Sequence, residues 1–173
     1  KVNASGVPNN GADPSIRPWQ GNYQSPDIWV VNDLNRDEPE LFNVPHPALD
    51  NELHVQVHNN SWLTLKEVRV EVKVRDYNAS SAPSAAWASL GVHTIDEIQG
   101  NSKAVSIWSG GETRGVFSRG DVSGGMKHKC IRVEIKPWKG VHTIEGQAVI
   151  FQESGAALRN NESQSNYTWA VSN

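Results

Sequence analysis

The sequence predicts an all-β protein, an antiparallel β-sandwich of about seven or eight strands. Three observations lead to this fold class. Short segments alternate apolar and polar residues, turns rich in Gly, Pro or Asn separate these segments, and no segment has the 3.6-residue apolar period of an amphipathic helix. A chain of 173 residues has the length of one domain that can bury a core without disulfides.

Residues 1–26 come before the first expected strand and have neither apolar period. Gly and Pro recur there among Asn and Ser, so this segment cannot build a core of its own. We expect an extended leader over residues 1–26 and the sandwich domain over residues 27–173. Because extended peptides can add to open sheet edges, we expect the leader to dock on a neighbouring copy through Val2, Val7, Ile16 and Trp19.

The first expected strand is "DIWVVN", residues 27–32, directly after Pro26. Residues 33–50 are expected to form a long loop, because three prolines each remove a ladder donor, namely Pro39, Pro45 and Pro47.

The clearest strand pattern lies in residues 52–59 and 67–77. In "ELHVQVHN" the apolar face consists of Leu53, Val55 and Val57, and the polar face of His54, Gln56 and His58. In "EVRVEVKVRDY" the apolar face consists of Val68, Val70, Val72 and Val74. A period of two with one apolar face is typical of antiparallel strands that cover a core on one side and meet water on the other.

The rest of the chain continues this pattern. Residues 80–90 form an expected loop with small residues around Trp87. Five more strands are expected after it, separated by Gly-rich turns, over residues 93–98, 104–109, 129–136, 146–152 and 166–173.

Several of these segments resemble one family. "SPDIWV" at residues 25–30, the N-x-L-x-V-x-V-x-N pattern that ends at Asn59, and "EVRVEVKV" are similar to bacterial immunoglobulin-like modules of the CARDB type. "VSIW", "HKCIRVEI" and "NNESQSNYTWAV" resemble the late strands of such modules. The resemblance covers about residues 25–173 and implies an immunoglobulin-like sandwich on a secreted or surface protein, with no catalytic residues.

Charge and hydropathy argue against two classes of partner. The net charge is −3, the pI is about 6.1, and Lys and Arg are scattered, so nucleic acid is not an expected partner. The mean hydropathy is −0.54 and no apolar run is long enough to span a bilayer, so membrane insertion is not expected.

Two features bear on the cellular location. The chain starts at Lys1 rather than Met, which suits a processed protein or a fragment of a longer one. Five Asn-x-Ser/Thr motifs are candidate glycosylation acceptors or simply polar loops, at Asn3, Asn59, Asn78, Asn161 and Asn166. We expect an extracellular or cell-surface protein.

The acidic segment "DLNRDE" places oxygen ligands at nearly alternating positions, at Asp33, Asn35, Asp37 and Glu38. Calcium loops have such spacing, but the Gly and Glu expected later in a calcium loop are absent, and a solvated acidic turn is the alternative. Apart from this calcium ion, no cofactor is expected. His54 and His58 share a strand face but lie about 13 Å apart, too far for a shared zinc ion.

The sequence offers no catalytic constellation. It has no GxSxG motif, and Asp96 and Glu97 point to opposite faces of one strand, so they cannot flank one bond. Cys130 alternates with the apolar residues of its strand and is expected to be exposed or covered by a loop. We expect a non-enzymatic protein.

The seven Trp residues are the remaining feature of note. Trp29 and Trp108 lie in expected strands and are expected to be buried against the facing sheet. Four others lie in or beside loops as lids or as exposed contact residues, namely Trp19, Trp62, Trp87 and Trp138. These residues leave two expectations: a module for protein contact, adhesion or assembly into an oligomer or filament, or a carbohydrate-binding module whose Trp rings stack on sugars.

Overall fold

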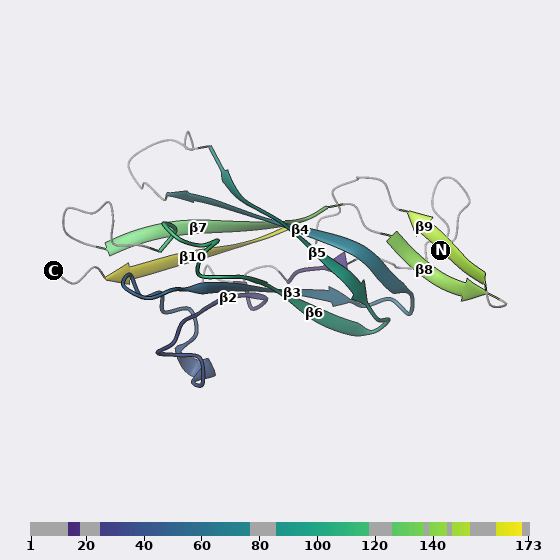
Figure 1. Ribbon diagram of the computed structural model, residues 1–173, viewed down its shortest axis with the longest axis horizontal. Helices are drawn as coiled ribbons and strands as arrows, with labels where there is room; N and C mark the ends of the chain where they lie inside the picture. Colours follow the sequence, from purple (N-terminus) through teal and green to yellow (C-terminus); the bar gives the residue numbers. More distant parts are fainter. Residues whose placement is uncertain are drawn as a thin grey trace.

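The computed structural model describes residues 14–17, 25–76, 86–117, 126–136, 139–144, 147–152 and 162–170. These residues form an all-β sandwich in which antiparallel strands make two sheets, as the sequence predicted (Figure 1). The helical structure within the described ranges is one short 3-10 turn, η1 (Pro39–Leu41).

The first sheet is built around β3 (Glu52–Asn59). β6 (Ser102–Trp108) pairs along one edge of β3. β2 (Ile28–Val31) and β1 (Pro14–Ser15) share its other edge, each pairing with a different part of β3.

The second sheet is built around β4 (Thr64–Asp76), with β5 (Ala88–Ile98) along one edge. The other edge of β4 is divided between two strands, each of which pairs with one further strand. One branch consists of β7 (Met126–Ile135) and β10 (Glu162–Ala170), and the other of β8 (Lys139–Ile144) and β9 (Gln147–Gln152).

The core lies between the sheets, and the alternation in the sequence predicted its main faces correctly. Leu53, Val55 and Val57 are fully buried on β3, and so are Val68, Val70 and Val72 on β4. Trp108 is also fully buried, as expected for a strand Trp.

Trp29 does not follow that expectation. Its neighbours Ile28 and Val30 take the core face of β2 and are fully buried, so Trp29 points to the outer face, opposite His54 on β3. The indole is therefore half-buried and lies 5.6 Å from the His54 ring, centroid to centroid.

Residues 14–17 of the expected leader belong to the sandwich. Pro14 and Ser15 pair with the end of β3, and Ile16 is fully buried in the core. The expectation that Ile16 contacts a neighbouring copy is wrong for this structure, because its own sandwich buries it. Val2, Val7 and Trp19 lie outside the described residues.

Two strands were not expected, and several strand boundaries differ from those expected; β4 begins at Thr64 and β7 at Met126, for example, three residues before the expected starts. β1 and β8 were not expected as strands, and β5 begins at Ala88, inside the expected loop 80–90. Near that end of β5 the register shifts between Val72 and Lys73 of β4, and Gly91 has a φ of 123°, so the irregular part of β5 coincides with the part that lacked alternation.

Candidate functional site

The outer face of the first sheet carries an apolar surface. We define it by four side chains, Trp29, His54, Val105 and Ile107. His54 pairs across the strands with Ile107, and Gln56 pairs with Val105. Val105 is 43% exposed and Ile107 is 47% exposed, although an outward strand position usually carries a polar residue. This surface can contact a partner through apolar area.

A polar cluster borders the same outer face at the start of β2. The Asp27 side chain is fully buried, and its Oδ1 accepts hydrogen bonds from Arg17 Nε at 2.9 Å and from Gln56 Nε2 at 3.1 Å. His58 Nε2 lies 2.9 Å from the same oxygen. The cluster ties residues 14–17 to β2 and β3.

The Asp27 carboxylate is held in its charged form. Burial raises its pKa, but hydrogen bonds from Arg17 and His58 lower it by more, so the pKa of Asp27 lies below its usual value. Sequence reasoning missed this cluster, because its members come from three separate segments and none has motif spacing.

A third arrangement links β5 and β6. The His93 ring stacks on Trp108 with centroids 4.1 Å apart and an interplanar angle of 6°. His93 Nδ1 lies 3.3 Å from Ser106 Oγ, and its Nε2 lies 2.6 Å from Glu112 Oε1. The backbone N–H of Ser109 donates to Glu112 and lowers the pKa of its carboxyl.

Ser106, His93 and Glu112 are the residue types of a Ser-His-acid catalytic triad, and they lie in that order of contact. The surroundings of these side chains nevertheless favour a structural role. Ser106 is 7% exposed and points between the sheets. The stacked indole of Trp108 covers the imidazole. We interpret this arrangement as a tie between the two sheets, and a non-enzymatic protein stays a prediction.

Of the four predicted contact Trp residues, the structure describes two, and their surroundings differ. Trp62 is 55% exposed at the corner between β3 and β4. Trp87 is half-buried, with the Arg75 guanidinium 4.5 Å and the Arg132 guanidinium 5.8 Å from its ring centroid. Trp19 and Trp138 lie outside the described residues. Trp62 and Trp87 do not form a shared binding site, because Trp62 lies at the corner between β3 and β4 and Trp87 lies beside Arg75 and Arg132.

The Trp62 corner is held by Asn59. The buried Asn59 Nδ2 donates to the carbonyls of Leu63 at 2.7 Å, Gln99 at 3.0 Å and Ile98 at 3.1 Å. Gly100 packs so closely that an added Cβ would overlap the Trp62 carbonyl. The exposed Trp62 indole therefore projects from a turn whose backbone is fixed by hydrogen bonds and close packing.

Asn59 is also a candidate glycosylation acceptor, and in this structure its amide nitrogen is buried and hydrogen-bonded, so its glycosylation stays a prediction. Asn166 lies in β10 opposite Cys130, and Asn3, Asn78 and Asn161 lie outside the described residues. Cys130 itself is buried, at 4% exposure.

The four candidate calcium ligands lie in the loop after β2. Asp33 is 83% exposed and lies 3.7 Å from Arg36, whereas Asn35 is buried and its Oδ1 accepts the backbone N–H of Asn32 at 2.7 Å. Asp37 and Glu38 are exposed. Within the described ranges no three His, Cys, Asp or Glu side chains are grouped to hold a metal ion. Calcium binding stays a prediction.

No protein-family model matches the chain, and no curated protein matches it. In the part of the chain that the structure describes, there is no helix of the length and apolarity needed to cross a membrane.

Proposed function

We propose that this protein is a non-catalytic, immunoglobulin-like module of a secreted or cell-surface protein, and that it makes protein contacts, with copies of itself first, through the apolar surface of Trp29, His54, Val105 and Ile107. The observation that carries the proposal is the exposure of Val105 and Ile107 on adjacent outward positions of β6.

The location of this surface supports a contact role. β6 pairs with β3 and with no other strand in the described ranges, so the two side chains lie beside an edge of the sheet. Exposed apolar side chains bordered by polar groups are typical of protein interaction sites, and aromatic residues are enriched in them. Here Gln56 and the rest of the Asp27 cluster supply the polar border.

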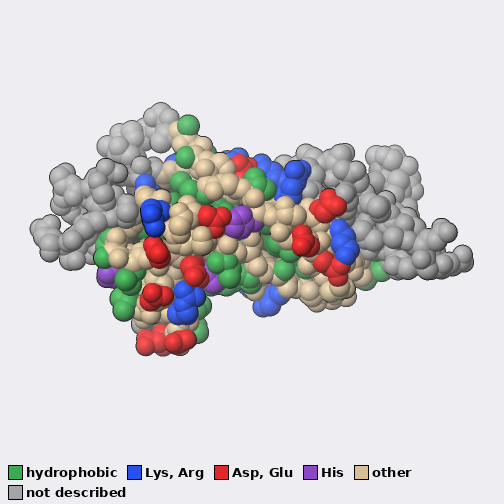
Figure 2. Space-filling view, in the orientation of Figure 1, with side chains coloured by type: hydrophobic (Ala, Val, Ile, Leu, Met, Phe, Trp, Pro, Cys, Tyr) green, Lys and Arg blue, Asp and Glu red, His purple; other side chains and the backbone are tan. Residues whose placement is uncertain are grey.

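Electrostatics favour a protein over a nucleic acid as the partner. Among the described residues on the face drawn in Figure 2, Lys and Arg side chains lie among Asp and Glu side chains, without a large area of positive charge. A phosphate backbone needs a concentrated basic surface.

The test compares charged substitutions on the two outer faces. Val105→Lys and Ile107→Lys place ammonium groups in the proposed contact, and Val92→Lys is the matched control, since Val92 is 48% exposed on the outer face of the second sheet. Analytical ultracentrifugation over a wide concentration range measures the association. We expect the wild type and Val92→Lys to associate, and the two β6 variants to remain monomers. A wild type that stays monomeric throughout would contradict the proposal.

The rigid Trp62 corner favours a second candidate function, carbohydrate binding. An exposed indole with a fixed backbone can stack on a sugar ring without ordering a loop first. A glycan array should then give binding that Trp62→Ala removes and Trp87→Ala keeps, because two guanidinium groups already cover Trp87. Silence across the array, or equal loss in both variants, would argue against this function.

A further inference from the structure

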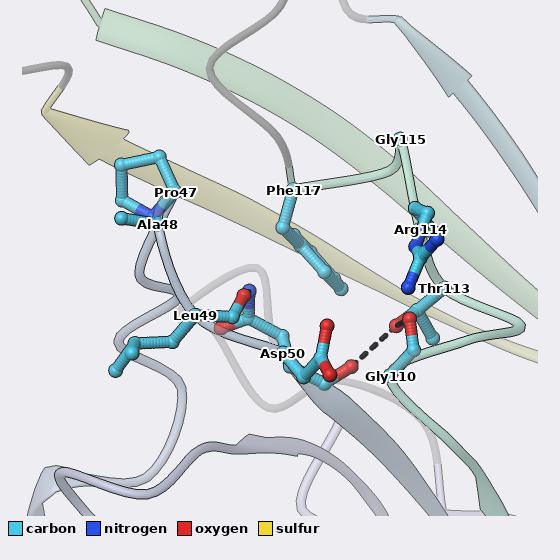
Figure 3. Close-up of a pocket in the computed structure, with 10 residues that line it drawn as sticks. Pro47, Ala48, Leu49, Asp50, Gly110, Thr113, Arg114, Gly115 and Phe117 are labelled. Atoms are coloured by element: carbon cyan, nitrogen blue, oxygen red, sulfur yellow. Dashed lines mark hydrogen bonds between the residues drawn. The ribbon is translucent and has the colours of Figure 1, made fainter.

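A hollow of about 170 Å³ lies at one end of the sandwich, between the loop that precedes β3 and the loop that follows β6. Leu53 and Trp108 pair across these strands, so the start of β3 and the end of β6 bring the two loops together. Ten residues line the hollow (Figure 3): Pro47, Ala48, Leu49, Asp50, Asn51, Gly110, Thr113, Arg114, Gly115 and Phe117.

Two opposite charges line this hollow, Asp50 from the first loop and Arg114 from the second. In the described structure they form no ion pair with each other and no hydrogen bond or ion pair with any other side chain. Polar and apolar groups contribute about equally to the rest of the lining, and the Phe117 ring extends into the space between the two loops (Figure 3). A carboxylate and a guanidinium are thus both available to a ligand beside the Phe117 ring.

The frame of the hollow is fixed before any ligand arrives. Thr113 Oγ1 donates to the Asn51 carbonyl and joins the two loops. Asn51 Nδ2 donates to the carbonyls of His46 at 2.9 Å and Leu49 at 3.0 Å. Gly110 packs against Asp50 so closely that an added Cβ would overlap its side chain. Such preorganisation lowers the entropy cost of binding.

We propose that this hollow binds a free apolar α-amino acid, with its carboxylate on Arg114, its ammonium on Asp50 and its side chain against Phe117. A ligand with only a carboxylate meets the repulsion of Asp50, and a ligand with only an amine meets that of Arg114. A zwitterion satisfies both charges.

The volume sets the size of the ligand. Drug-sized ligands occupy pockets of roughly 300 Å³ or more, whereas a cavity of about 150 Å³ accommodates benzene. A hollow of about 170 Å³ therefore suits one side chain such as that of leucine or phenylalanine, with the charged groups of the amino acid at the open side.

The experiment is isothermal titration of the full chain with four compounds. Leucine and phenylalanine carry both charges, 4-methylpentanoate lacks the ammonium, and 3-methylbutylamine lacks the carboxylate. We expect the amino acids to bind and each singly charged compound to bind about ten- to a hundredfold more weakly, which is the loss expected for one charge-assisted contact. Equal binding of 4-methylpentanoate, or no binding of either amino acid up to about 10 mM, would overturn the proposal.

Variants locate the binding. Arg114→Gln and Asp50→Asn should each weaken leucine binding about ten- to a hundredfold. Lys103→Gln is the control, because Lys103 is an exposed residue of β6 outside the hollow, and this variant should bind leucine as the wild type does. Amide NMR shifts give a second measurement, because leucine should move the signals of Thr113 and Gly115 in the wild type and not in Arg114→Gln. Shifts that persist in both pocket variants would overturn the assignment. Asp50 and Arg114 do not belong to the apolar surface of Trp29, His54, Val105 and Ile107. Either proposal can therefore fail without the other.

Discussion

The Asp27 carboxylate is fully buried just before β2. It accepts hydrogen bonds from both the backbone N–H and the side chain of Arg17, which lies ten positions earlier in the chain. Arg17 N lies 2.7 Å from Asp27 Oδ2, and Arg17 Nη2 lies 2.5 Å from Asp27 Oδ1. A buried carboxylate is tolerated when charged or polar donors satisfy it, and here those donors also hold Ile16 in the core.

Removal of Arg17 should therefore destabilise the domain. Arg17→Ala keeps the backbone N–H that donates to Asp27 Oδ2 but removes the guanidinium, so the buried charge loses its cationic partner, and we expect a loss of about 2 kcal/mol in the free energy of unfolding. Arg36→Ala is the matched control, since Arg36 also makes two hydrogen bonds to a carboxylate, Glu52, but at the surface, and it should destabilise the domain much less. Urea denaturation measures both. Equal losses of unfolding free energy in the two variants would show that the buried Arg17–Asp27 contact stabilises the domain no more than the surface Arg36–Glu52 contact.

The lowered pKa of Asp27 predicts how stability changes with pH. The unfolded chain binds a proton near a pH of about 3.9, while the folded carboxyl stays ionised to lower pH, so the unfolded state holds more protons in that window. This contribution is fully present above the unfolded pKa and is lost as pH falls through the folded pKa.

Asp27→Asn should remove that contribution. Glu52, Glu71, Glu112 and Glu134 also have lowered pKa values, so the wild type loses stability in acid for several reasons. The relevant quantity is the difference between wild type and Asp27→Asn, which should shrink as pH falls below about 4. Thermal unfolding of both proteins along a pH series measures it, and a difference that is constant with pH would contradict the assignment.

The sequence predicted the sandwich and its core faces because period-two alternation is local. Val55 and Val70 can be assigned to a buried face without knowing which strands they meet. The outward position of Trp29 also follows from the alternation, since Ile28 and Val30 occupy the buried face of the same strand, whereas the general preference of Trp for burial predicts the wrong face.

The sites were harder to predict because they depend on pairing. The Asp27 cluster needs residues 14–17 against the end of β3, and the Asp50 and Arg114 hollow needs two loops that meet only when β3 pairs with β6. β8 was missed for a similar reason, since its partner is the short stretch Thr64, Leu65 and Lys66 at the start of β4. Long-range contacts of this kind leave no local pattern.

The next prediction tests which side chains of β4 face the core, and the neighbouring residue of the same strand is its control. Val70→Asp forces a carboxylate into the core, where Val70 is fully buried, and should cost about 4 kcal/mol or more, enough to unfold a domain of ordinary stability. Arg69→Asp places the same side chain one residue earlier on the exposed face and should leave the domain folded. Circular dichroism with thermal melts distinguishes them, and similar melting temperatures would show that the register is wrong.

The last prediction concerns Asn59, whose amide holds the corner that presents Trp62. Asn59→Ala leaves the carbonyls of Leu63, Ile98 and Gln99 without their shared donor and should cost about 2 kcal/mol. Asn60→Ala is the control, because Asn60 is exposed and makes one long contact with Ser15, at 3.4 Å. Both variants remove the same side chain one residue apart, so chemical denaturation compares them directly. Because Asn59 fixes the turn rather than the indole, Asn59→Ala should also broaden the side-chain NMR signal of Trp62, while Asn60→Ala leaves it sharp. An Asn59→Ala protein as stable as Asn60→Ala, with Trp62 unchanged, would mean that the corner is held by Gly100 and the strands alone.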